Sequence, residues 1–369
     1  MQKVCHVTSV HSSDDNRIFN KECSSLAAAG YEVYLVAQGA DRVQNGVKVI
    51  GVGDIPKSRF RRMFGFSGKV YRKALELDCE LYHLHDPELL PYALKFRRKG
   101  KKVIFDSHEK YTDTLKKKTY LKGFIGKTVI KLYEAYENHV FRRIDAVIFP
   151  CLYKGEHPFR GKCKRVETVD NMPIIEELYD QYDPQVQKWE RSACYIGVIA
   201  KSRGVENFIK ANNKAGGYSY IGGYYRNEDF RKELESSEAY ASVRYLGKLD
   251  RSQVLDTLQH CRVGMATLLN VGQYNKYDNL PTKAYEYMSL GLPVILSKSD
   301  YNSRIMEEYR FGICVDPADT EEIAQALEYL YTHEEEARQM GENGRDAVIR
   351  RFNWEHEKAK LVKLYQEVL

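Results

Sequence analysis

The segment YDNLPTKAYEYMSLGLPVILS, residues 277–297, carries side chains at a spacing that suits the binding of an anion. Asn279 is expected to cap a helix, Pro281 fits the first helical turn, and Gly291 is expected to end the helix before an apolar strand. The N-terminus of such a helix presents unpaired N–H groups and the positive end of a dipole. Because Lys283 adds a positive charge in the first turn, the segment predicts a site for a diphosphate.

Two acidic residues accompany Lys283. Glu286 lies one turn further along the same helix, where its carboxylate can accept two hydrogen bonds from neighbouring hydroxyls such as those of a ribose. Asp278 precedes Glu286 by eight positions, in a loop from which it can reach a sugar beyond the diphosphate. Asn279 and Thr282 complete this expected binding set. The alternative is that Glu286 and Lys283 form an ordinary ion pair on the helix surface.

A second segment with a phosphate-binding pattern is YIGVIAKSRGVENF, residues 195–208, which predicts a strand, a turn and a helix. Gly197 and Gly204 lie in the turn, and Arg203 directly precedes Gly204 at the start of the helix. A forked guanidinium at this position can bind phosphate oxygens together with Lys283. The alternative for Arg203 is an ordinary surface charge.

In the first half of the chain, polar side chains follow apolar strands at the end where open parallel sheets bind ligands. The expected substrate-binding residues are His11, Ser12, Asp14, Asp15, Arg17, His85 and Asp86. Adjacent carboxylates with an arginine suit a substrate rich in hydroxyls, although Asp14 or Asp15 can also cap the following helix. A lone buried histidine usually satisfies a hydrogen bond in the core. His108 instead stands at a strand end between acids, which favours a functional role.

Short β-branched runs alternate with helix-length segments along the whole chain, which predicts parallel sheets with crossover helices. We expect two doubly wound α/β domains of the Rossmann-like type, at 1–171 and 193–350. A linker at 172–192 contains Pro173 and Pro184, and a terminal helix in 351–369 is expected to cross back to the first domain. The expected strands are 3–9, 32–38, 47–53, 81–86, 102–108, 146–150 and 166–170 in the first half, and 193–197, 218–223, 243–247, 263–267, 293–297 and 312–316 in the second.

Composition and missing motifs exclude several classes of protein. No apolar run approaches the roughly 18 residues needed to cross a bilayer, and the N-terminus MQKVCHVTSV predicts a buried strand, so we expect a cytoplasmic protein. The eight cysteines include no CxxC pair and are expected to be reduced core thiols. The turn HSSDDNRIF lacks the GxGxxG of a dinucleotide-binding protein. No His/Cys cluster or DxD-like pair has metal-ligand spacing along the chain, so no metal or other cofactor is expected.

The segment PTKAYEYMSLGLPVI resembles the donor-binding signature of glycosyltransferase family 4, whose acid-x7-Glu pair contacts the donor sugar and the ribose. The segments HVTSVHSSDDNRIFNKECSSLAAAGYEVYLVA, HDPELLP, FDSHE and FNWE also resemble the bacterial polysaccharide members of this family, so the resemblance covers nearly the whole chain. Two positions depart from the pattern. Asp278 replaces the usual Glu, and Val198 and Arg203 stand where the family has an Arg and a Lys.

The resemblance implies a GT-B fold, in which two Rossmann-like domains face each other across a cleft and the second binds a nucleotide-sugar donor, here expected to be a UDP-sugar. It also implies retaining, metal-independent transfer of the sugar, with Arg203, Lys283 and the helix N-terminus stabilising the leaving diphosphate. His108 matches a histidine that lies against the donor sugar. The residues expected to take part in catalysis are therefore His108, Arg203, Lys283 and Glu286. Those expected to bind the donor are Gly197, Arg203, Gly204, Asp278, Asn279, Thr282, Lys283 and Glu286.

Two alternatives to a transferase stay open at this point. A nucleotide-sugar epimerase uses the same two-domain scaffold but needs no acceptor. The second alternative is a catalytically inactive scaffold that binds nucleotide sugars, because Val198 and Asp278 depart from the family pattern.

The positive charge of the chain lies in its first half, where residues 1–190 contain 33 Lys and Arg against 25 Asp and Glu. Two stretches without acids, 57–73 and 116–131, combine basic with aromatic and aliphatic residues. Such stretches predict contact with an anionic membrane surface, and a solvated helix face is the alternative. No nucleic-acid-binding motif is present. We therefore expect a peripheral protein at the inner face of the membrane, acting in surface polysaccharide biosynthesis on a glycan or polyprenyl-diphosphate-linked acceptor.

Overall fold

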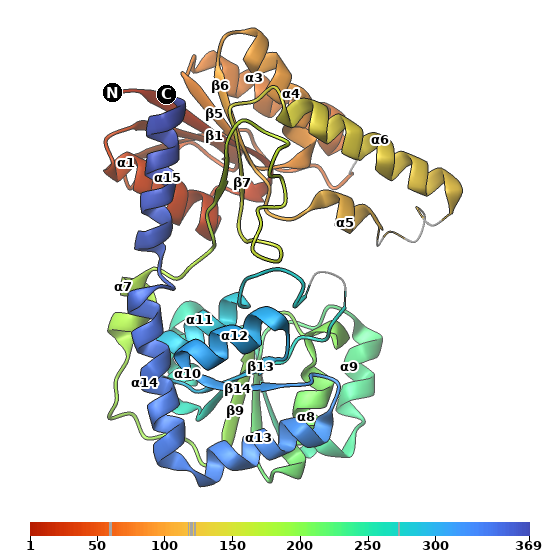
Figure 1. Cartoon of the computed structure of the whole chain (residues 1–369), viewed down its shortest axis with the longest axis vertical. Coiled ribbons are helices and arrows are strands. Elements are labelled where there is room, and N and C mark those ends of the chain that lie inside the picture. Colours follow the sequence, from red (N-terminus) through yellow and green to blue (C-terminus); the bar gives the residue numbers. More distant parts are fainter. Residues whose placement is uncertain (59–60, 117, 119–120, 122, 272–273) are drawn as a thin grey trace. The chain divides into compact units, whose positions relative to one another are not determined.

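The computed structural model describes residues 1–58, 61–116, 118, 121, 123–271 and 274–369. The chain divides into two compact units, each with its own sheet (Figure 1). The first unit comprises Met1–Asn171 and Glu355–Leu369, and the second comprises Met172–Trp354.

The first unit is built on an eight-stranded sheet with the order β3-β4-β2-β1-β5-β6-β7-β8. Its strands are β1 (Lys3–Ser12), β2 (Glu32–Gln38), β3 (Arg42–Gln44), β4 (Val47–Gly51), β5 (Leu81–Leu84), β6 (Lys102–Asp106), β7 (Ala146–Phe149) and β8 (Val166–Thr168). All neighbours are parallel except β3, which runs antiparallel to β4. Strands β5 and β7 are buried along their whole length because helices cover both faces of a parallel sheet. The strand order reverses between β1 and β5, where doubly wound sheets bind their ligands.

Helices and helical turns surround this sheet: η1 (Asn16–Cys23), α1 (Ser24–Ala28), η2 (Arg62–Phe66), α3 (Ser67–Glu76), η3 (Pro87–Leu89), α4 (Leu90–Arg98), α5 (Tyr111–Lys116), α6 (Phe124–Phe141) and α15 (Trp354–Val368). The C-terminal helix α15 belongs to this unit although it stands at the opposite end of the sequence from β1 and α1 (Figure 1). It is fixed there by Tyr365, whose ring packs against Tyr31 and whose hydroxyl lies 2.8 Å from His83 Nδ1.

The second unit has a six-stranded sheet with the order β11-β10-β9-β12-β13-β14, and all its neighbours are parallel. Its strands are β9 (Ser192–Ile196), β10 (Tyr218–Gly222), β11 (Val243–Gly247), β12 (Val263–Ala266), β13 (Val294–Ser297) and β14 (Gly312–Val315). This is the strand order of the doubly wound Rossmann fold, and it reverses between β9 and β12.

The helices of the second unit pack on both faces of its sheet. They are α7 (Ile175–Leu178), η5 (Tyr179–Gln181), η6 (Lys201–Arg203), α8 (Val205–Lys214), α9 (Glu228–Glu235), η7 (Glu238–Ser242), α10 (Arg251–His260), α11 (Thr282–Ser289), α12 (Asp300–Tyr309), α13 (Thr320–Thr332) and α14 (Glu334–Arg350). Successive strand residues point to opposite faces, so Ile295 joins the core formed with α8 and α13 while Val294 and Leu296 join the core formed with α11 and α12.

The expected strands of both sheets are confirmed. The structure also contains β3, which was not expected because a strand of three residues leaves no clear sequence pattern. The expectation that Asn279 caps a helix was wrong. Helix α11 begins at Thr282 after Pro281, and no side chain caps it. Residues 172–192, expected to connect the domains, contain α7 and η5 and belong to the second unit.

Within the described residues, no helix is both long enough and apolar enough to cross a lipid bilayer. All eight cysteines are free thiols, and Cys163 and Cys314 are the two that are partly exposed.

Candidate active site

The second unit holds Lys283 in the first turn of α11, close to the loop that follows β9. Its Nζ lies 3.2 Å from the centre of the Tyr195 ring, shielded from solvent, and forms no hydrogen bond within the part of the chain that the structure describes. Burial, followed by the nearby charge of Arg203, lowers the pKa of Lys283 well below its ordinary value. An unpaired buried cation is costly, and an anion at this place would remove that cost.

Two glycines let the backbone after β9 approach Lys283 and β12. Gly197 has a φ of +142°, and a Cβ added to it would lie 3.6 Å from Lys283 Nζ. Gly204 has a φ of +71°, and a Cβ there would lie 1.8 Å from the carbonyl oxygen of Thr267, which no side chain tolerates. The loop is therefore built from close backbone contacts beside a buried positive charge, a combination that is also found in phosphate-binding loops.

Arg203 ends the short η6 helix and precedes α8. Its guanidinium carbon lies 4.6 Å from the centre of the Tyr274 ring, an arrangement that holds the planar group in one orientation. Val198, at a position where the family has an arginine, accepts a hydrogen bond at its carbonyl from the Tyr195 hydroxyl (2.7 Å). Arg203 and Lys283 thus share this region, in agreement with the charge effect on the pKa of Lys283.

Glu286 is partly exposed and pairs with Arg251, the first residue of α10, across 2.9 Å between Oε1 and Nη1. Glu286 and Lys283 therefore do not form the surface ion pair that was the alternative. Lys283 Nζ is shielded and forms no hydrogen bond among the described residues. Asp278 and Asn279 are half-buried in the loop before α11, and Thr282 is exposed at its start. Sequence reasoning missed Arg251, because α10 and α11 are far apart along the chain and no local pattern connects them.

The first unit contains a cavity of about 450 Å³ at the carboxyl ends of β1, β5 and β6. This position is the point where the strand order reverses. The cavity is lined by Val10, His11, Arg62, His85, Asp86, Pro87, Glu88, Phe105, Ser107, His108, Glu109, Tyr111, Thr114 and Lys118. Four of the expected residues, His11, His85, Asp86 and His108, therefore share one cavity.

The carboxylate of Asp86 is fixed on one side of the cavity. Its Oδ2 accepts hydrogen bonds from the Thr8 hydroxyl (2.8 Å) and the Ser9 backbone N–H (2.6 Å). Its Oδ1 lies 3.4 Å from His11 Nε2, while His11 Nδ1 lies 3.3 Å from Asp15. Burial lowers the pKa of His11, but Asp15 and Asp86 outweigh this effect and raise it overall. His11 is thus suited to carry a positive charge in the cavity wall.

A second carboxylate, Asp106, lies below the cavity at the end of β6. It accepts hydrogen bonds from the buried Arg17 through Nε (3.0 Å) and Nη2 (3.2 Å), and it lies 3.2 Å from His108 Nε2. Burial alone would raise the pKa of Asp106, yet Arg17 and His108 hold it well below its ordinary range. Asp106 therefore stays ionised and orients His108 toward the cavity.

Four of the expected substrate-binding residues lie outside the lining of this cavity. Arg17 is buried against Asp106, so its role there is to hold a carboxylate rather than to reach the cavity. Asp14 pairs with Arg42, and Ser12 accepts a hydrogen bond from the Asp14 backbone. Asp15 also lies outside the lining. It caps η1 by accepting from two backbone N–H groups, which is the alternative given for it above, and it contacts His11.

Residues that sequence reasoning missed also line the cavity. Arg62 donates to both oxygens of Glu88 from Nε (3.0 and 3.2 Å), and this pair forms part of the wall. Glu88 stands two positions after Asp86 in a helical turn at the same strand end, a signal that could have been used. Arg62 comes from a different element and could not have been placed from sequence.

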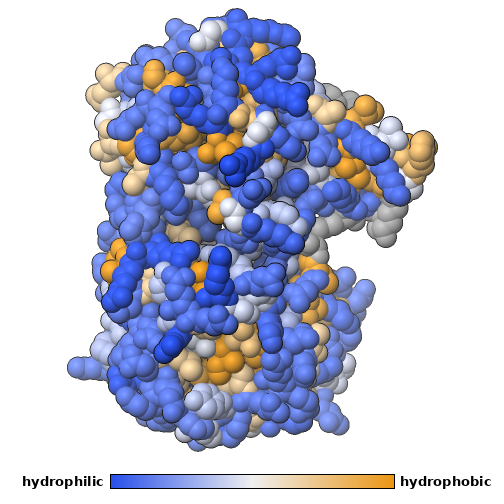
Figure 2. Space-filling view, in the orientation of Figure 1, coloured by the Kyte–Doolittle hydropathy of each residue, from blue (hydrophilic) through white to orange (hydrophobic). Residues whose placement is uncertain are grey.

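The two basic stretches differ in their surroundings. In the first, Arg62 is paired with Glu88, and Lys69 donates to the Val52 carbonyl (2.7 Å). In the second, α6 exposes an apolar strip beside Lys127 and Lys131, which Figure 2 shows as orange atoms on the surface that α6 forms. The strip consists of Phe124, Ile125, Val129, Leu132 and Tyr136. Outside the described residues lie Arg59, Phe60, Lys117, Tyr120 and Lys122, and the side chain of Phe64 is likewise not described.

Two doubly wound parallel units, each with polar side chains at the carboxyl ends of its strands, are the architecture of GT-B glycosyltransferases. Residues 16–153 match the family model described as Glycosyltransferase Family 4, and residues 183–347 match the one described as Glycosyl transferases group 1. The chain therefore belongs to the family 4 type of GT-B glycosyltransferases.

Known proteins resemble this chain in sequence or in fold. An uncharacterized glycosyltransferase of Methanocaldococcus jannaschii is 21% identical over 301 residues, which are 74% of this chain and 69% of that protein. The sucrose-phosphate synthase of Thermosynechococcus elongatus superposes with a TM-score of 0.75 at 16% identity, covering 100% of this chain and 99% of the other. HepE of Anabaena, solved with UDP-glucose, gives a TM-score of 0.70 at 13% identity, with both chains covered completely.

Proposed function

We propose that this glycosyltransferase moves a sugar, with retention of its anomeric configuration, from a UDP-sugar to a glycan or a polyprenyl-diphosphate-linked acceptor in surface polysaccharide biosynthesis. The proposal rests on the environment of Lys283. Its Nζ lies beside Gly197, is shielded from solvent and forms no hydrogen bond among the described residues. A diphosphate at the N-terminus of α11 would supply the missing partner.

The donor would extend from this diphosphate in two directions. Glu286, one turn further along α11, would bind the ribose hydroxyls, and Asp278 before the helix would contact the sugar. A UDP-sugar is the preferred donor, because similar folds include HepE in complex with UDP-glucose and UDP-forming trehalose-phosphate synthases of Burkholderia. Arg203 and Lys283 would stabilise the charge that builds on the leaving diphosphate, and this effect needs no metal ion.

The acceptor would bind in the cavity of the first unit. Asp86 and Glu88 offer carboxylates for hydroxyl groups, while His11, Arg62 and Lys118 offer positive charge for a phosphate of the acceptor. A trehalose-phosphate synthase of similar fold has been solved with glucose-6-phosphate, a phosphorylated sugar. This mixed lining favours transfer to an acceptor over epimerisation of a bound donor, which requires no second substrate site.

Retention is proposed from the likeness to glycosyltransferase family 4, and no side chain is assigned as a covalent nucleophile, so a double displacement is not invoked. Attack by the acceptor on the face from which the diphosphate leaves, with the departing phosphate taking the acceptor proton, accounts for the residues present. His108, oriented by Asp106, would lie against the donor sugar and position it.

The protein is further proposed to act at the inner, anionic face of the cell membrane. The support is the strip on α6, where Phe124 and Ile125 are 86% and 80% exposed next to lysines. Apolar side chains of this kind enter the lipid interface while the lysines contact anionic headgroups. A lipid-linked acceptor would be presented at that surface.

A panel of nucleotide sugars tests the function. Ligands that bind the folded state raise the unfolding temperature, so we expect a UDP-sugar to give the largest shift, both in EDTA and in Mg²⁺. The selected donor should then be incubated with polyprenyl-diphosphate-linked and free glycan acceptors, and the product linkage determined by NMR. An axial donor linkage should stay axial. Inversion of the linkage, or donor binding that requires Mg²⁺, would overturn the corresponding part of the proposal.

A further inference from the structure

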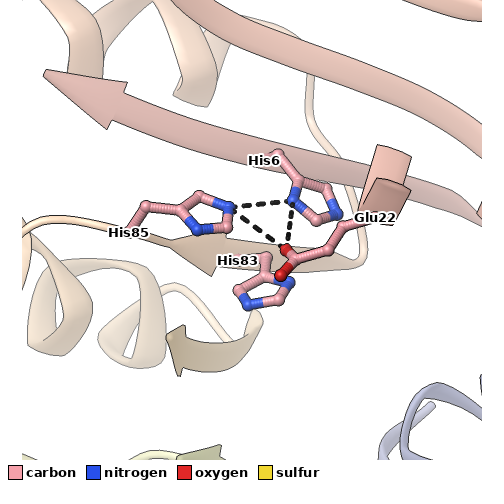
Figure 3. Close-up of side chains that lie close together, drawn as sticks. All are labelled: His6, Glu22, His83 and His85. Atoms are coloured by element: carbon pink, nitrogen blue, oxygen red, sulfur yellow. Dashed lines mark hydrogen bonds and ion pairs between the residues drawn. The ribbon is translucent and has the colours of Figure 1, made fainter. Parts of the chain in front are cut away.

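Three histidines of the first unit gather on one face of its sheet because of strand register. His6 of β1 pairs with His83 of β5, and His85 lies two residues further along the chain, so all three side chains point to the same face. The η1 helix lies over this face and contributes Glu22 (Figure 3). All four side chains are buried, with exposed fractions of 0 to 2%.

The distances within this group of four residues, here called the histidine–glutamate cluster, suit a metal ion. His6 Nδ1 lies 2.9 Å from His85 Nε2, and Glu22 Oε2 lies 3.8 and 3.9 Å from these two nitrogens. One ligand atom from each of the four residues falls within 4.8 Å of the others. A tetrahedral zinc ion with bonds of about 2.0–2.1 Å requires ligand atoms roughly 3.4 Å apart, so small side-chain movements would complete the site.

Several polar atoms of the cluster have no hydrogen-bond partner although they are buried. Among the described residues, neither oxygen of Glu22 accepts a hydrogen bond, and His83 Nε2 forms none. Glu22 Oε1 forms an ion pair with Arg17 (3.0 Å to Nε), and the Glu22 carboxyl group also interacts with that of Asp106. Lone pairs that are buried and unused are uncommon in folded proteins, and metal coordination would use them.

The outer nitrogens of the histidines are oriented as they are in known metal centres. The Tyr365 hydroxyl lies 3.0 Å from His6 Nε2 and 2.8 Å from His83 Nδ1, while His85 Nδ1 lies 3.6 Å from Asp106 Oδ2. Metal-bound histidines usually donate their second N–H to such an oxygen, which fixes the ring and its tautomer. His6 therefore has one nitrogen facing the cluster and the other facing the Tyr365 oxygen, while the outer nitrogen of His85 lies between His108 Nε2 (3.2 Å) and Asp106.

We propose that His6, Glu22, His83 and His85 bind a divalent transition-metal ion, zinc by the ligand set, as a structural centre of the first unit. Three imidazoles and one carboxylate satisfy the four positions of tetrahedral zinc, so the site is closed and does not activate a substrate. The ion would join β1, β5 and η1, and through Tyr365 it would also fix α15. Since His85 also lines the cavity, the ion would hold one wall of the proposed acceptor site.

Sequence spacing concealed this cluster, because its members stand at 6, 22, 83 and 85 and meet only through the parallel pairing of β1 with β5. The histidine–glutamate cluster is separate from the proposed diphosphate site, for which no metal ion is proposed. A test of metal binding by the cluster can therefore fail or succeed independently of a test of donor binding.

The test uses the full-length protein, purified without metal-affinity steps and treated with a chelator. Zn²⁺ should bind one ion per chain and raise the unfolding temperature in proportion to the logarithm of free zinc. Co²⁺ in its place should give the intense visible bands of a tetrahedral site. His83→Gln and Glu22→Gln should lose stoichiometric binding and these bands. His157→Gln alters a partly buried histidine that contacts the Glu167 carbonyl outside the cluster, and it should retain both.

Because these substitutions lie in the first unit, resistance of that unit to limited proteolysis, rather than nucleotide binding by the second unit, shows that each variant has folded. Wild-type protein that binds none of Zn²⁺, Co²⁺, Ni²⁺ and Cu²⁺ stoichiometrically would overturn the proposal and leave a metal-free hydrogen-bond network. Retention of the tetrahedral cobalt bands in folded Glu22→Gln and His83→Gln would overturn it as well, because the ion would then be bound elsewhere.

Discussion

Lys283 and Glu286 lie three positions apart on α11 and yet occupy different environments. Lys283 Nζ is enclosed above the Tyr195 ring, whereas Glu286 is partly exposed and paired with Arg251. The two side chains are therefore expected to contribute to different parts of donor binding. Lys283 would act through charge on the diphosphate, and Glu286 through hydrogen bonds to the ribose.

Replacing Glu286 with alanine should weaken UDP and UDP-sugar by the same factor, because both contain the ribose. Loss of a hydrogen bond to a charged group typically costs about 1.5–3 kcal/mol, which corresponds to roughly 10- to 150-fold in affinity. Calorimetric titration of both ligands measures the factor. Arg251→Ala is the matched control, since it removes the ion pair and keeps the carboxylate. Unchanged affinity in Glu286→Ala would show that the ribose binds elsewhere.

Binding of a diphosphate should be accompanied by proton uptake at alkaline pH. Burial lowers the pKa of Lys283 well below 10.5 in the free protein, so part of the population is neutral between this lowered pKa and 10.5. A bound diphosphate favours the charged form and raises the pKa again, which requires a proton from solution. Below the lowered pKa the lysine is already charged, and the uptake should vanish.

Calorimetry of UDP binding in buffers with different ionisation enthalpies detects this uptake. Lys283→Met removes the titrating group and keeps the side-chain length, so it should show no uptake at any pH above the range in which phosphate titrates. Uptake of the same size in Lys283→Met would assign the proton to another group.

At this scale the sequence was informative where one element supplies the chemistry. Lys283 and Glu286 were placed on one helix because a 3.6-residue period fixes their relation. Their partners Tyr195 and Arg251 come from β9 and α10, and no local pattern connects those segments with α11. The sequence predicts a substrate-binding role for Arg17 because it follows two acids, whereas its partner in the structure, Asp106, is 89 positions away.

Among the elements, buried parallel strands were the most predictable, since their continuous apolar runs admit few other structures. Helix starts were less certain. Asn279 has the residue type of a cap, but Pro281 takes that position and α11 starts without a side-chain cap. The histidine–glutamate cluster had a signal in the alternation of His83 and His85, which puts both on one face of the sheet. The pairing of His83 with His6 depends on register and could not be deduced.

Helix α6 should attach the protein to anionic vesicles. Phe124→Ser/Ile125→Ser removes two exposed apolar side chains, and Lys127→Glu/Lys131→Glu reverses two exposed charges. Each basic residue near an anionic surface contributes about 1 kcal/mol, so the charge reversal should weaken binding by at least roughly 30-fold. Vesicle co-sedimentation at low salt measures the binding, which should fall as salt rises.

Val43→Ser is the control for these variants, because Val43 is 74% exposed in the same unit but lies on β3. It should bind vesicles like the wild type. Wild-type protein that ignores anionic vesicles at low salt would refute the membrane assignment, and full binding by the Phe124/Ile125 variant would show that α6 is not the contact.

For the whole molecule, the proposed binding sites are divided between the two units. The second unit contains the residues proposed for the donor, and the first contains the cavity proposed for the acceptor together with the histidine–glutamate cluster. Each has its own sheet and core, so changes in the first unit can be made without altering nucleotide binding by the second, although His108 of the first unit is also proposed to contact the donor sugar. Chelation, for example, should affect the stability of the first unit while nucleotide affinity in the second stays the same.

The most direct test of the account compares the affinities of UDP and UMP for wild-type protein and for Lys283→Met. If Lys283 and the N-terminus of α11 hold the diphosphate, the wild type should bind UDP much more tightly than UMP. Lys283→Met should lose most of this preference, while its affinity for UMP stays close to that of the wild type. A wild type without preference for UDP, or a Lys283→Met variant that retains the whole preference, would contradict the placement of the donor on α11.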